Sequence, residues 1–260
     1  MEYPTRLLLL VMPVVMAVVP GRAIESAPGS SHSTYVLVHG ATGGGWDWRT
    51  VDRLLVADGH TVYRPTLTGL GEKVHLASPD INLTTHINDI VNVILFEDLH
   101  DAILVGHSHG GMVSAGVMDR IPARLSHVIF LDAAVPDDGQ SMVSMRGPLP
   151  PEHKVVDGQI FFSWIKSDKA PPRDAPQSHK TYTELVSYRN PAAKLLPATY
   201  VAFVPPGESA RPAQDDTWKR AKARGWTMRT LANDHNAQRS HPKKLGALLE
   251  DALKDRNQPR

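Results

Sequence analysis

The residues best suited to chemistry are residues 106–110, which read Gly-His-Ser-His-Gly and place a serine in the pattern G-x-S-x-G. An apolar run at residues 102–105 precedes them, and small or apolar residues follow at 111–118. A strand, a sharp turn and a helix in this order expose a serine hydroxyl at the carboxyl end of a sheet. Because glycine allows such a tight turn, the pattern predicts that Ser108 is a nucleophile.

A serine hydroxyl needs a neighbouring base, because it is a weak nucleophile at neutral pH. Among thirteen histidines, His235 is the best candidate, since it lies in the loop directly after the last expected strand, residues 227–231. Parallel strands end at the same edge of a sheet, which places this loop beside Ser108. We therefore expect His235 to be the base, oriented by a carboxylate that precedes it in the chain.

Two carboxylates are candidates for that acid. Glu208 follows the expected strand at residues 198–204 and leaves room for one helix and one strand before His235. Asp132 directly follows the expected strand at residues 125–131 and is also suited to cap a turn. We prefer Glu208 and keep Asp132 as the alternative acid.

Two backbone N–H groups are expected to bind the oxyanion, those of Ala41 and His109. Ala41 follows the first expected strand and Gly40, and the glycines at 43–45 keep this loop close to the site. His107 and His109 flank the serine, but no carboxylate stands beside them and the chain has no cysteine. We therefore expect them to shape the floor of a substrate pocket and to bind no metal ion.

Composition is that of a globular protein with one sizeable core. The chain has 260 residues, 42% of them hydrophobic and 21% charged. A formal net charge of +1 gives no electrostatic argument for a nucleic-acid partner. The absence of cysteine excludes a disulfide framework, a thiol nucleophile and cysteine-ligated zinc. The oligomeric state stays open.

Short apolar runs alternate with helical patterns from residue 34 to the end of the chain. This alternation predicts an α/β fold with a mostly parallel six-stranded sheet and helices on both faces. The expected strands are residues 35–38, 61–65, 102–105, 125–131, 198–204 and 227–231. The expected helices include 46–58, one beginning after a cap at Thr84 or Thr85, 216–224 and 242–254.

A long irregular segment interrupts the alternation at residues 136–197. It is rich in Pro, Asp, Ser and Lys, yet it contains aromatic side chains that include Trp164. An insertion of this length favours a function, so we expect a helical lid over the carboxyl edge of the sheet. Trp164 is then a candidate contact for an apolar part of the substrate. A merely decorative insertion is the alternative.

The first 33 residues resemble a secretory signal followed by a polar linker. A short region with one arginine precedes an apolar run at residues 7–20, and small residues follow it. The run is short for a bilayer span and is interrupted by Pro13. We expect a secreted or periplasmic protein whose hydrolytic domain covers residues 34–260. An uncleaved membrane anchor, or an apolar segment on a cytoplasmic domain, is the alternative.

Five segments together resemble the α/β-hydrolase superfamily, in particular the compact branch of plant methylesterases, hydroxynitrile lyases and bacterial pyrethroid-hydrolysing carboxylesterases. They are residues 35–48, 65–75, 85–92, 104–112 and 128–141. The resemblance implies a cofactor-free esterase acting on small esters or lactones through an acyl-enzyme. It assigns Ser108 as nucleophile, His235 as base and Ala41 and His109 as oxyanion donors, and it accepts a glutamate such as Glu208 as the acid.

Two other functions are alternatives. Hydroxynitrile lyases resemble this chain but have a threonine where Gly40 stands and a lysine where Asn236 stands. Because Asn236 has no positive charge to stabilise a leaving cyanide, the resemblance favours ester hydrolysis. A ligand receptor or scaffold that kept the fold and lost turnover is the alternative from another class.

Overall fold

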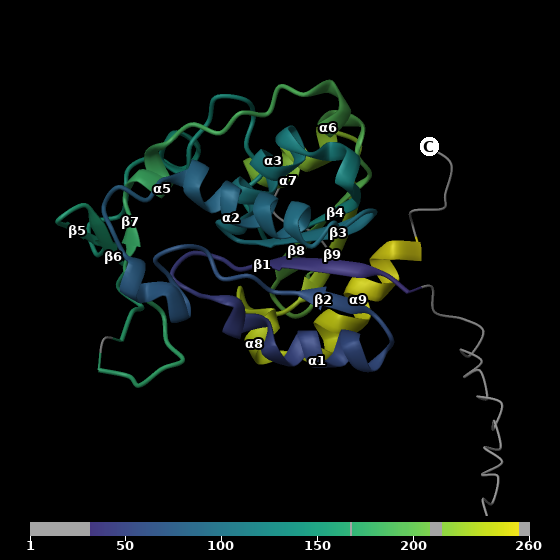
Figure 1. Cartoon of the computed structure of the whole chain (residues 1–260), viewed down its shortest axis with the longest axis horizontal. Coiled ribbons are helices and arrows are strands. Elements are labelled where there is room, and N and C mark those ends of the chain that lie inside the picture. The colour runs from purple at the N-terminus through teal and green to yellow at the C-terminus, as the bar shows by residue number, and fades with distance from the viewer. Residues whose placement is uncertain (1–31, 167, 209–214, 255–260) are drawn as a thin grey trace, which may run out of the picture. The chain divides into compact units, whose positions relative to one another are not determined.

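Six parallel strands form the centre of the structure, a computed structural model that describes residues 32–166, 168–208 and 215–254 (Figure 1). Their order across the sheet is β2-β1-β3-β4-β8-β9. The strands are β1 (Thr34–Val38), β2 (Thr61–Tyr63), β3 (Ala102–His107), β4 (Leu125–Leu131), β8 (Ala198–Val204) and β9 (Thr227–Ala232). The expected α/β fold and its six-stranded sheet are confirmed.

Helices cover both faces of the sheet, with α2, α3 and α7 on one side and α1, α8 and α9 on the other (Figure 1). Their bounds are α1 (Arg49–Ala57), α2 (Leu83–Phe96), α3 (Gly110–Arg120), α7 (Asp216–Ala223), α8 (Ala237–Ser240) and α9 (Pro242–Lys254). The 3₁₀ turns are η1 (Gly45–Trp48), η2 (Gly71–Leu76) and η3 (Pro122–Arg124). Alternate residues of β1 enter two separate apolar layers, Val36 and Val38 one, Tyr35 and Leu37 the other.

The start of α2 differs from the expected cap at Thr84 or Thr85. Asn82 is the cap, because its extended backbone lets its side chain accept a hydrogen bond from the Thr85 N–H at 2.9 Å. Thr85 is at the third helical position, and its side chain accepts a hydrogen bond from the Asn82 N–H, which completes a capping box. The first expected helix is also divided, since residues 45–48 form the tighter turn η1 before α1 begins.

The insertion (residues 136–197) contains a small sheet as well as the expected helices. The helices are α4 (Met142–Arg146), α5 (Lys180–Thr183) and α6 (Pro191–Leu195), and the strands are β5 (Lys154–Val156), β6 (Gln159–Phe161) and β7 (Gln177–Ser178). Asp157 and Gly158 both have positive φ, 48° and 73°, and join β5 to β6. A two-residue Asp-Gly turn of this kind favours a hairpin. The insertion therefore contains a hairpin in addition to the expected helices.

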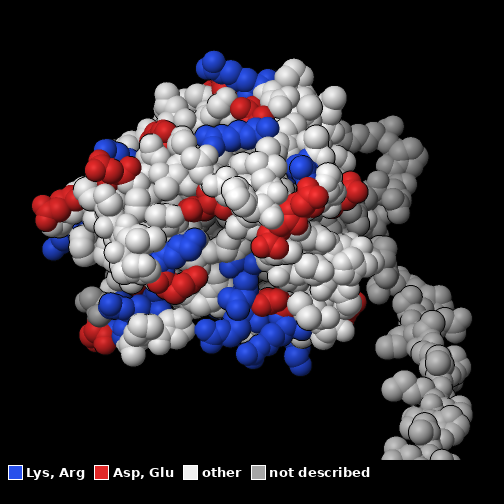
Figure 2. Space-filling view, viewed as in Figure 1, with Lys and Arg blue, Asp and Glu red and all other residues white. Residues whose placement is uncertain are grey.

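Charged side chains of both signs are interspersed over the face seen in Figure 2. Several form exposed or half-exposed ion pairs, such as Arg124 with Asp98 at 2.7 Å and Arg189 with Asp138 at 2.9 Å. Pairs of this kind contribute little to stability because solvent screens them. The fold therefore depends on the two apolar layers of the sheet.

The expected secretory signal falls in residues 1–31, which lie outside the described residues. Within residues 32–254, apart from the short gaps named above, no helix combines the length and apolar character that a bilayer span requires. The signal therefore stays a prediction from the sequence.

Four buried histidines are held in the uncharged form. Burial lowers the pKa of His39 and His86 to about 4, and that of His107 and His109 to about 3. In the unfolded chain these imidazoles take up protons near pH 6.5, whereas in the folded protein they do not until the pH is far lower. The free energy of unfolding is therefore highest above pH 6.5 and falls as the pH is lowered through this window.

Replacing His86 with Gln should weaken this pH dependence. His86 Nε2 lies 3.1 Å from the Thr68 carbonyl, a bond that a Gln amide can also donate. When the pH is lowered from 7 to 5, the free energy of unfolding should fall in both proteins. We expect the fall to be about 2 kcal/mol smaller in His86→Gln than in the parent. Urea denaturation at the two pH values measures this, with the exposed His75→Gln as the control. An equal loss in His86→Gln and the parent would contradict it.

Candidate active site

Ser108 lies on a strained turn between β3 and α3. Its φ of +54° is in the left-handed region, which a side chain other than glycine adopts only when the surroundings impose it. The surroundings are tight, because a Cβ added to Gly106 would lie 2.3 Å from Ser114 Oγ. The turn therefore lifts the serine hydroxyl clear of the sheet, as the G-x-S-x-G pattern predicts.

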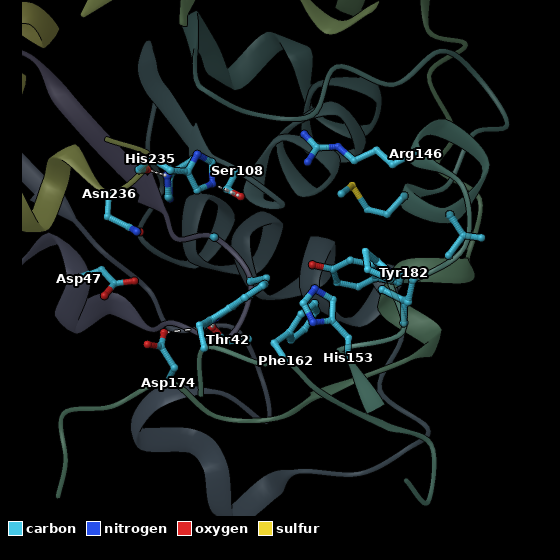
Figure 3. A pocket seen from close by; sticks show the side chains of 18 of the residues that line it. Thr42, Asp47, Ser108, Arg146, His153, Phe162, Asp174, Tyr182, His235 and Asn236 are labelled. Atoms are coloured by element: carbon cyan, nitrogen blue, oxygen red, sulfur yellow. Dashed lines mark hydrogen bonds between the residues drawn. The ribbon is translucent and has the colours of Figure 1, made fainter. Parts of the chain in front are cut away.

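Three side chains form a hydrogen-bonded chain at the carboxyl edge of the sheet. His235 Nε2 lies 2.8 Å from Ser108 Oγ, and His235 Nδ1 lies 2.6 Å from Asp132 Oδ2. Ser108 follows β3, and His235 comes from the loop after β9 (Figure 3). Asp132 follows β4. The structure thus brings together the serine, the histidine and the alternative acid of the sequence analysis.

The preference for Glu208 is corrected by this geometry. Glu208 lies exposed on the loop after β8, where its backbone N–H donates to the Pro205 carbonyl at 3.1 Å. Asp132 lies immediately after β4, which is the direct neighbour of β3, and its φ of +44° turns the chain at once. The Phe203 N–H also donates to Asp132 Oδ1 at 3.4 Å, which helps to fix the carboxylate.

Two backbone N–H groups beside Ser108 are without a hydrogen-bond partner among the described residues. They belong to Ala41 and His109, the two expected oxyanion donors. The loop of Ala41 closely contacts the serine, because a Cβ on Gly40 would lie 3.0 Å from Ser108 Cβ. The arrangement offers two donors to an oxygen held near Ser108 Oγ.

His107 has a role that the sequence analysis missed. Its Nε2 lies 2.7 Å from the His235 carbonyl, which only accepts, so this nitrogen carries the proton. Gln238 Nε2 lies 3.4 Å from the other ring nitrogen. Burial, reinforced by the nearby His235, lowers the pKa of His107 to about 3, so the ring stays neutral. His107 thus fixes the backbone of the His235 loop as well as lining the pocket.

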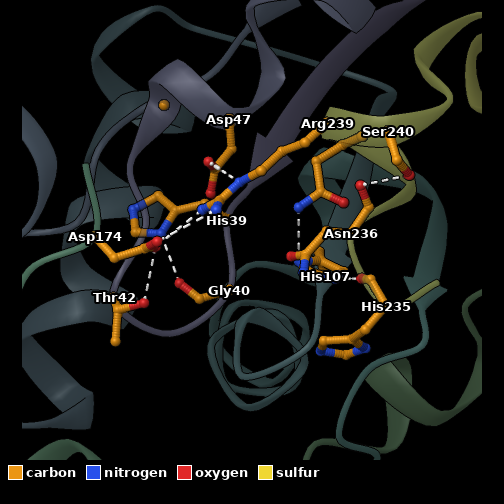
Figure 4. A network of polar contacts seen from close by, with 12 residues as sticks. His39, Gly40, Thr42, Asp47, His107, Asp174, His235, Asn236, Arg239 and Ser240 are labelled. Carbon is orange, nitrogen blue, oxygen red and sulfur yellow. Dashed lines mark hydrogen bonds and ion pairs between the residues drawn. The ribbon is translucent and has the colours of Figure 1, made fainter. Parts of the chain in front are cut away.

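Arg239 joins three segments around the site (Figure 4). It lies on α8, and it binds Asp47 of η1 at 2.7 Å and Asp174 of the insertion at 2.9 Å. Its guanidinium also lies 4.5 Å from the centre of the Trp46 ring. Burial alone would lower the pKa of Arg239, but the hydrogen bonds to Asp174 and Asp47 raise it. Pattern reading missed this cluster because its members are far apart in the chain.

A cavity of about 770 Å³ opens over Ser108 and His235 (Figure 3). The insertion supplies most of its apolar wall, including Met142, Leu149 and Phe162. Trp164 lines it as well, half-exposed, and donates from Nε1 to Thr42 Oγ1 at 3.2 Å. This placement agrees with the expected contact between Trp164 and an apolar part of a ligand.

Residues 35–253 match the Alpha/beta hydrolase family. The chain belongs to this family. Among the residues that the structure describes, no three His, Asp or Glu side chains form a group suited to a metal ion.

Two curated relatives share sequence with this hydrolase. A carbendazim-hydrolysing esterase of Nocardioides sp. is 46% identical over 46% of this chain and 50% of its own length. Methylesterase 2 of Arabidopsis thaliana is 35% identical over 52% of this chain and 49% of its own length. The matches thus span about half of each relative.

Two solved structures share the fold of this hydrolase. A pyrethroid hydrolase from Sphingobium faniae has a TM-score of 0.66 at 20% identity and covers 88% of this chain and 99% of its own. An extracellular α/β-hydrolase from a Paenibacillus species has a TM-score of 0.66 at 22% identity, over 85% and 98% of the two chains. At this identity the likeness describes the fold.

Removing the Arg239 side chain should destabilise the protein strongly. Asp47 is buried, so Arg239→Met leaves an unpaired carboxylate in the interior, at a cost of about 3–5 kcal/mol. Chemical denaturation at pH 7 measures the loss, and adding Asp47→Asn should recover part of it. The control is Arg189→Met, which breaks an exposed pair and should cost less than about 1 kcal/mol. Equal losses in the two Met variants would contradict the role of the cluster.

Proposed function

We propose that the protein is a carboxylesterase-type serine hydrolase that cleaves small carboxylic esters, including lactones, through an acyl-enzyme. The observation that carries the proposal is the hydrogen-bonded chain from Ser108 through His235 to Asp132, beside two unpaired N–H donors. Esterases among the sequence relatives support the same reaction class. The apolar wall of the cavity favours a substrate with an apolar acyl or alcohol part.

The first half of the reaction forms the acyl-enzyme. His235 Nε2 accepts the proton of Ser108 Oγ while Oγ attacks the ester carbonyl, and the carboxylate of Asp132 stabilises the imidazolium. The N–H groups of Ala41 and His109 bind the carbonyl oxygen as it becomes negative. The C–O bond to the alcohol then breaks, and His235 gives its proton to the leaving oxygen.

The second half returns the enzyme. A water molecule takes the place of the alcohol and gives a proton to His235 Nε2 as its oxygen attacks the acyl carbon. The same two N–H groups bind the second oxyanion. The bond between the acyl carbon and Ser108 Oγ breaks, Oγ takes the proton back from His235, and the carboxylic acid leaves.

The cavity disfavours a lyase that releases cyanide. Asn236 lines the cavity next to His235 and has no charge, and Gly40 offers no hydroxyl on the oxyanion side. A leaving cyanide would therefore meet neither a charged side chain at position 236 nor a hydroxyl at position 40. Hydrolysis needs neither group, because the alcohol leaves with the proton from His235.

Replacing Ser108 with Ala should abolish turnover and leave the fold intact. We expect kcat for a 4-nitrophenyl ester to fall by about four orders of magnitude. A fluorophosphonate probe should label the parent and leave Ser108→Ala unlabelled, with the thermal midpoint checked by circular dichroism. Near-parental hydrolysis by the folded variant would contradict the mechanism. A parent that stays unlabelled would favour a non-catalytic ligand receptor.

Two variants that replace a carboxylate with an amide distinguish the candidate acids. Asp132→Asn keeps the shape of the side chain but removes the charge that orients and stabilises the protonated His235. We expect a loss in kcat of about three to four orders of magnitude. Glu208→Gln should retain parental kcat, because Glu208 lies exposed and apart from His235. The reverse result would reassign the acid.

A further inference from the structure

One cation on the wall of the cavity is not engaged by the protein. Four charged Asp or Arg side chains line the cavity, and three of them, Asp47, Asp174 and Arg239, are paired with one another. The fourth is Arg146. Within residues 32–254, as far as the structure describes them, Arg146 forms neither an ion pair nor a hydrogen bond. A guanidinium with five free donors on a cavity wall is suited to an anion.

Arg146 is aimed at the reacting end of the cavity. It is the last residue of α4, in the insertion, and its side chain extends into the cavity toward the side where Ser108 and His235 lie (Figure 3). A ligand that reaches from Ser108 to the insertion therefore meets this guanidinium. The wall around it includes the apolar side chains of Met142 and Leu149.

A neutral donor lines the same cavity as this cation. Tyr182 lines the cavity, and its hydroxyl has no hydrogen-bond partner among the described residues (Figure 3). Burial raises the pKa of Tyr182, and the opposing effect of the Arg146 charge is smaller, so the phenol keeps its proton.

The Tyr182 ring is held in place by an uncharged histidine. The rings of Tyr182 and His109 are stacked, with centres 4.7 Å apart and planes at 1°. His109 is buried and follows the nucleophile, so the Tyr182 hydroxyl keeps a fixed relation to Ser108. A fixed O–H donor and a guanidinium on the wall of one cavity can together bind the oxygens of a carboxylate.

We infer that Arg146 and the Tyr182 hydroxyl bind a free carboxylate of the substrate, so that the preferred esters carry an anionic group besides the bond that is cleaved. The inference rests on the proposed esterase function and narrows its substrate class. Monoesters of short dicarboxylic acids, and esters of hydroxy acids, have this chemistry. Ser108 cleaves the ester while Arg146 holds the far carboxylate, which takes no part in bond breaking.

The test compares anionic and neutral esters of the same shape. One pair places the charge on the acyl side, 4-nitrophenyl hydrogen glutarate against 4-nitrophenyl methyl glutarate. The other places it on the alcohol side, 4-carboxyphenyl butyrate against 4-carbamoylphenyl butyrate. The readout is the ratio of kcat/KM for the anionic ester to kcat/KM for the neutral ester. The pair that shows the preference identifies the side of the ester that faces Arg146.

In at least one pair, the parent should prefer the anionic ester, and Arg146→Gln should lower the ratio by about 10- to 100-fold. Arg146→Lys keeps the positive charge but loses the paired N–H donors of the guanidinium. Its ratio should therefore lie between those of the parent and Arg146→Gln. Tyr182→Phe should lower the same ratio by a smaller factor. The control is Lys154→Gln, an exposed cation of the same insertion that does not line the cavity, and it should leave the ratio unchanged.

Two failures are distinguishable. If the parent hydrolyses the neutral esters but Arg146→Gln leaves both ratios as they are, the carboxylate site is wrong and the esterase proposal stands. If the ratio falls equally in Lys154→Gln, the effect is a general one of net charge, and the site is also wrong. If the parent hydrolyses none of the esters and no fluorophosphonate labels Ser108, the proposed function fails and the inference fails with it.

Discussion

The arrangement of the site depends on one side chain, His235, which is hydrogen-bonded to a hydroxyl through one ring nitrogen and to a carboxylate through the other. The contacts of 2.8 Å to Ser108 and 2.6 Å to Asp132 join three loops that follow different strands. Two of these loops have a residue with positive φ directly after the strand, Ser108 and Asp132. The parallel sheet serves to bring these turns to one edge, and the strain in them directs the side chains toward the histidine.

The short loop of His235, between β9 and α8, has to be held in place, because β9 lies at the edge of the sheet and β8 separates it from β4. Two anchors hold it. His107 donates from its neutral ring to the His235 carbonyl. Arg239, on the following helix α8, binds Asp47 of η1 and Asp174 of the insertion. Because His107 is buried and the Arg239 side chain is partly buried, solvent screens these contacts less than it screens the exposed ion pairs of the surface.

Local patterns in the sequence were enough to predict the elements and two of the three site side chains. The alternation of apolar runs predicts the six strands, and G-x-S-x-G between a strand and a helix predicts the turn at Ser108. His235 follows from its place after the last strand. The acid could not be predicted from the sequence, because Glu208 and Asp132 both come after a strand. The choice between them depends on β4 lying next to β3 in the sheet.

The other omissions have the same physical cause. Arg239, Asp47 and Asp174 meet through tertiary packing, and no local pattern connects them. The hairpin of the insertion was available from the Asp157-Gly158 pair between β-branched residues, but the polar composition around it favoured loop and helix. Arg146 and Tyr182 belong to this part of the chain, where sequence is least informative about which side chains face the substrate.

The most direct test of the account is to trap the covalent intermediate. The parent protein is mixed with an excess of a slowly released 4-nitrophenyl ester, quenched with acid and digested for mass spectrometry. We expect one acyl group per chain, on the peptide that contains Ser108, together with a burst of nitrophenolate of the same stoichiometry. Turnover without a burst and without an acylated Ser108 peptide, or an acyl group on another residue, would contradict it.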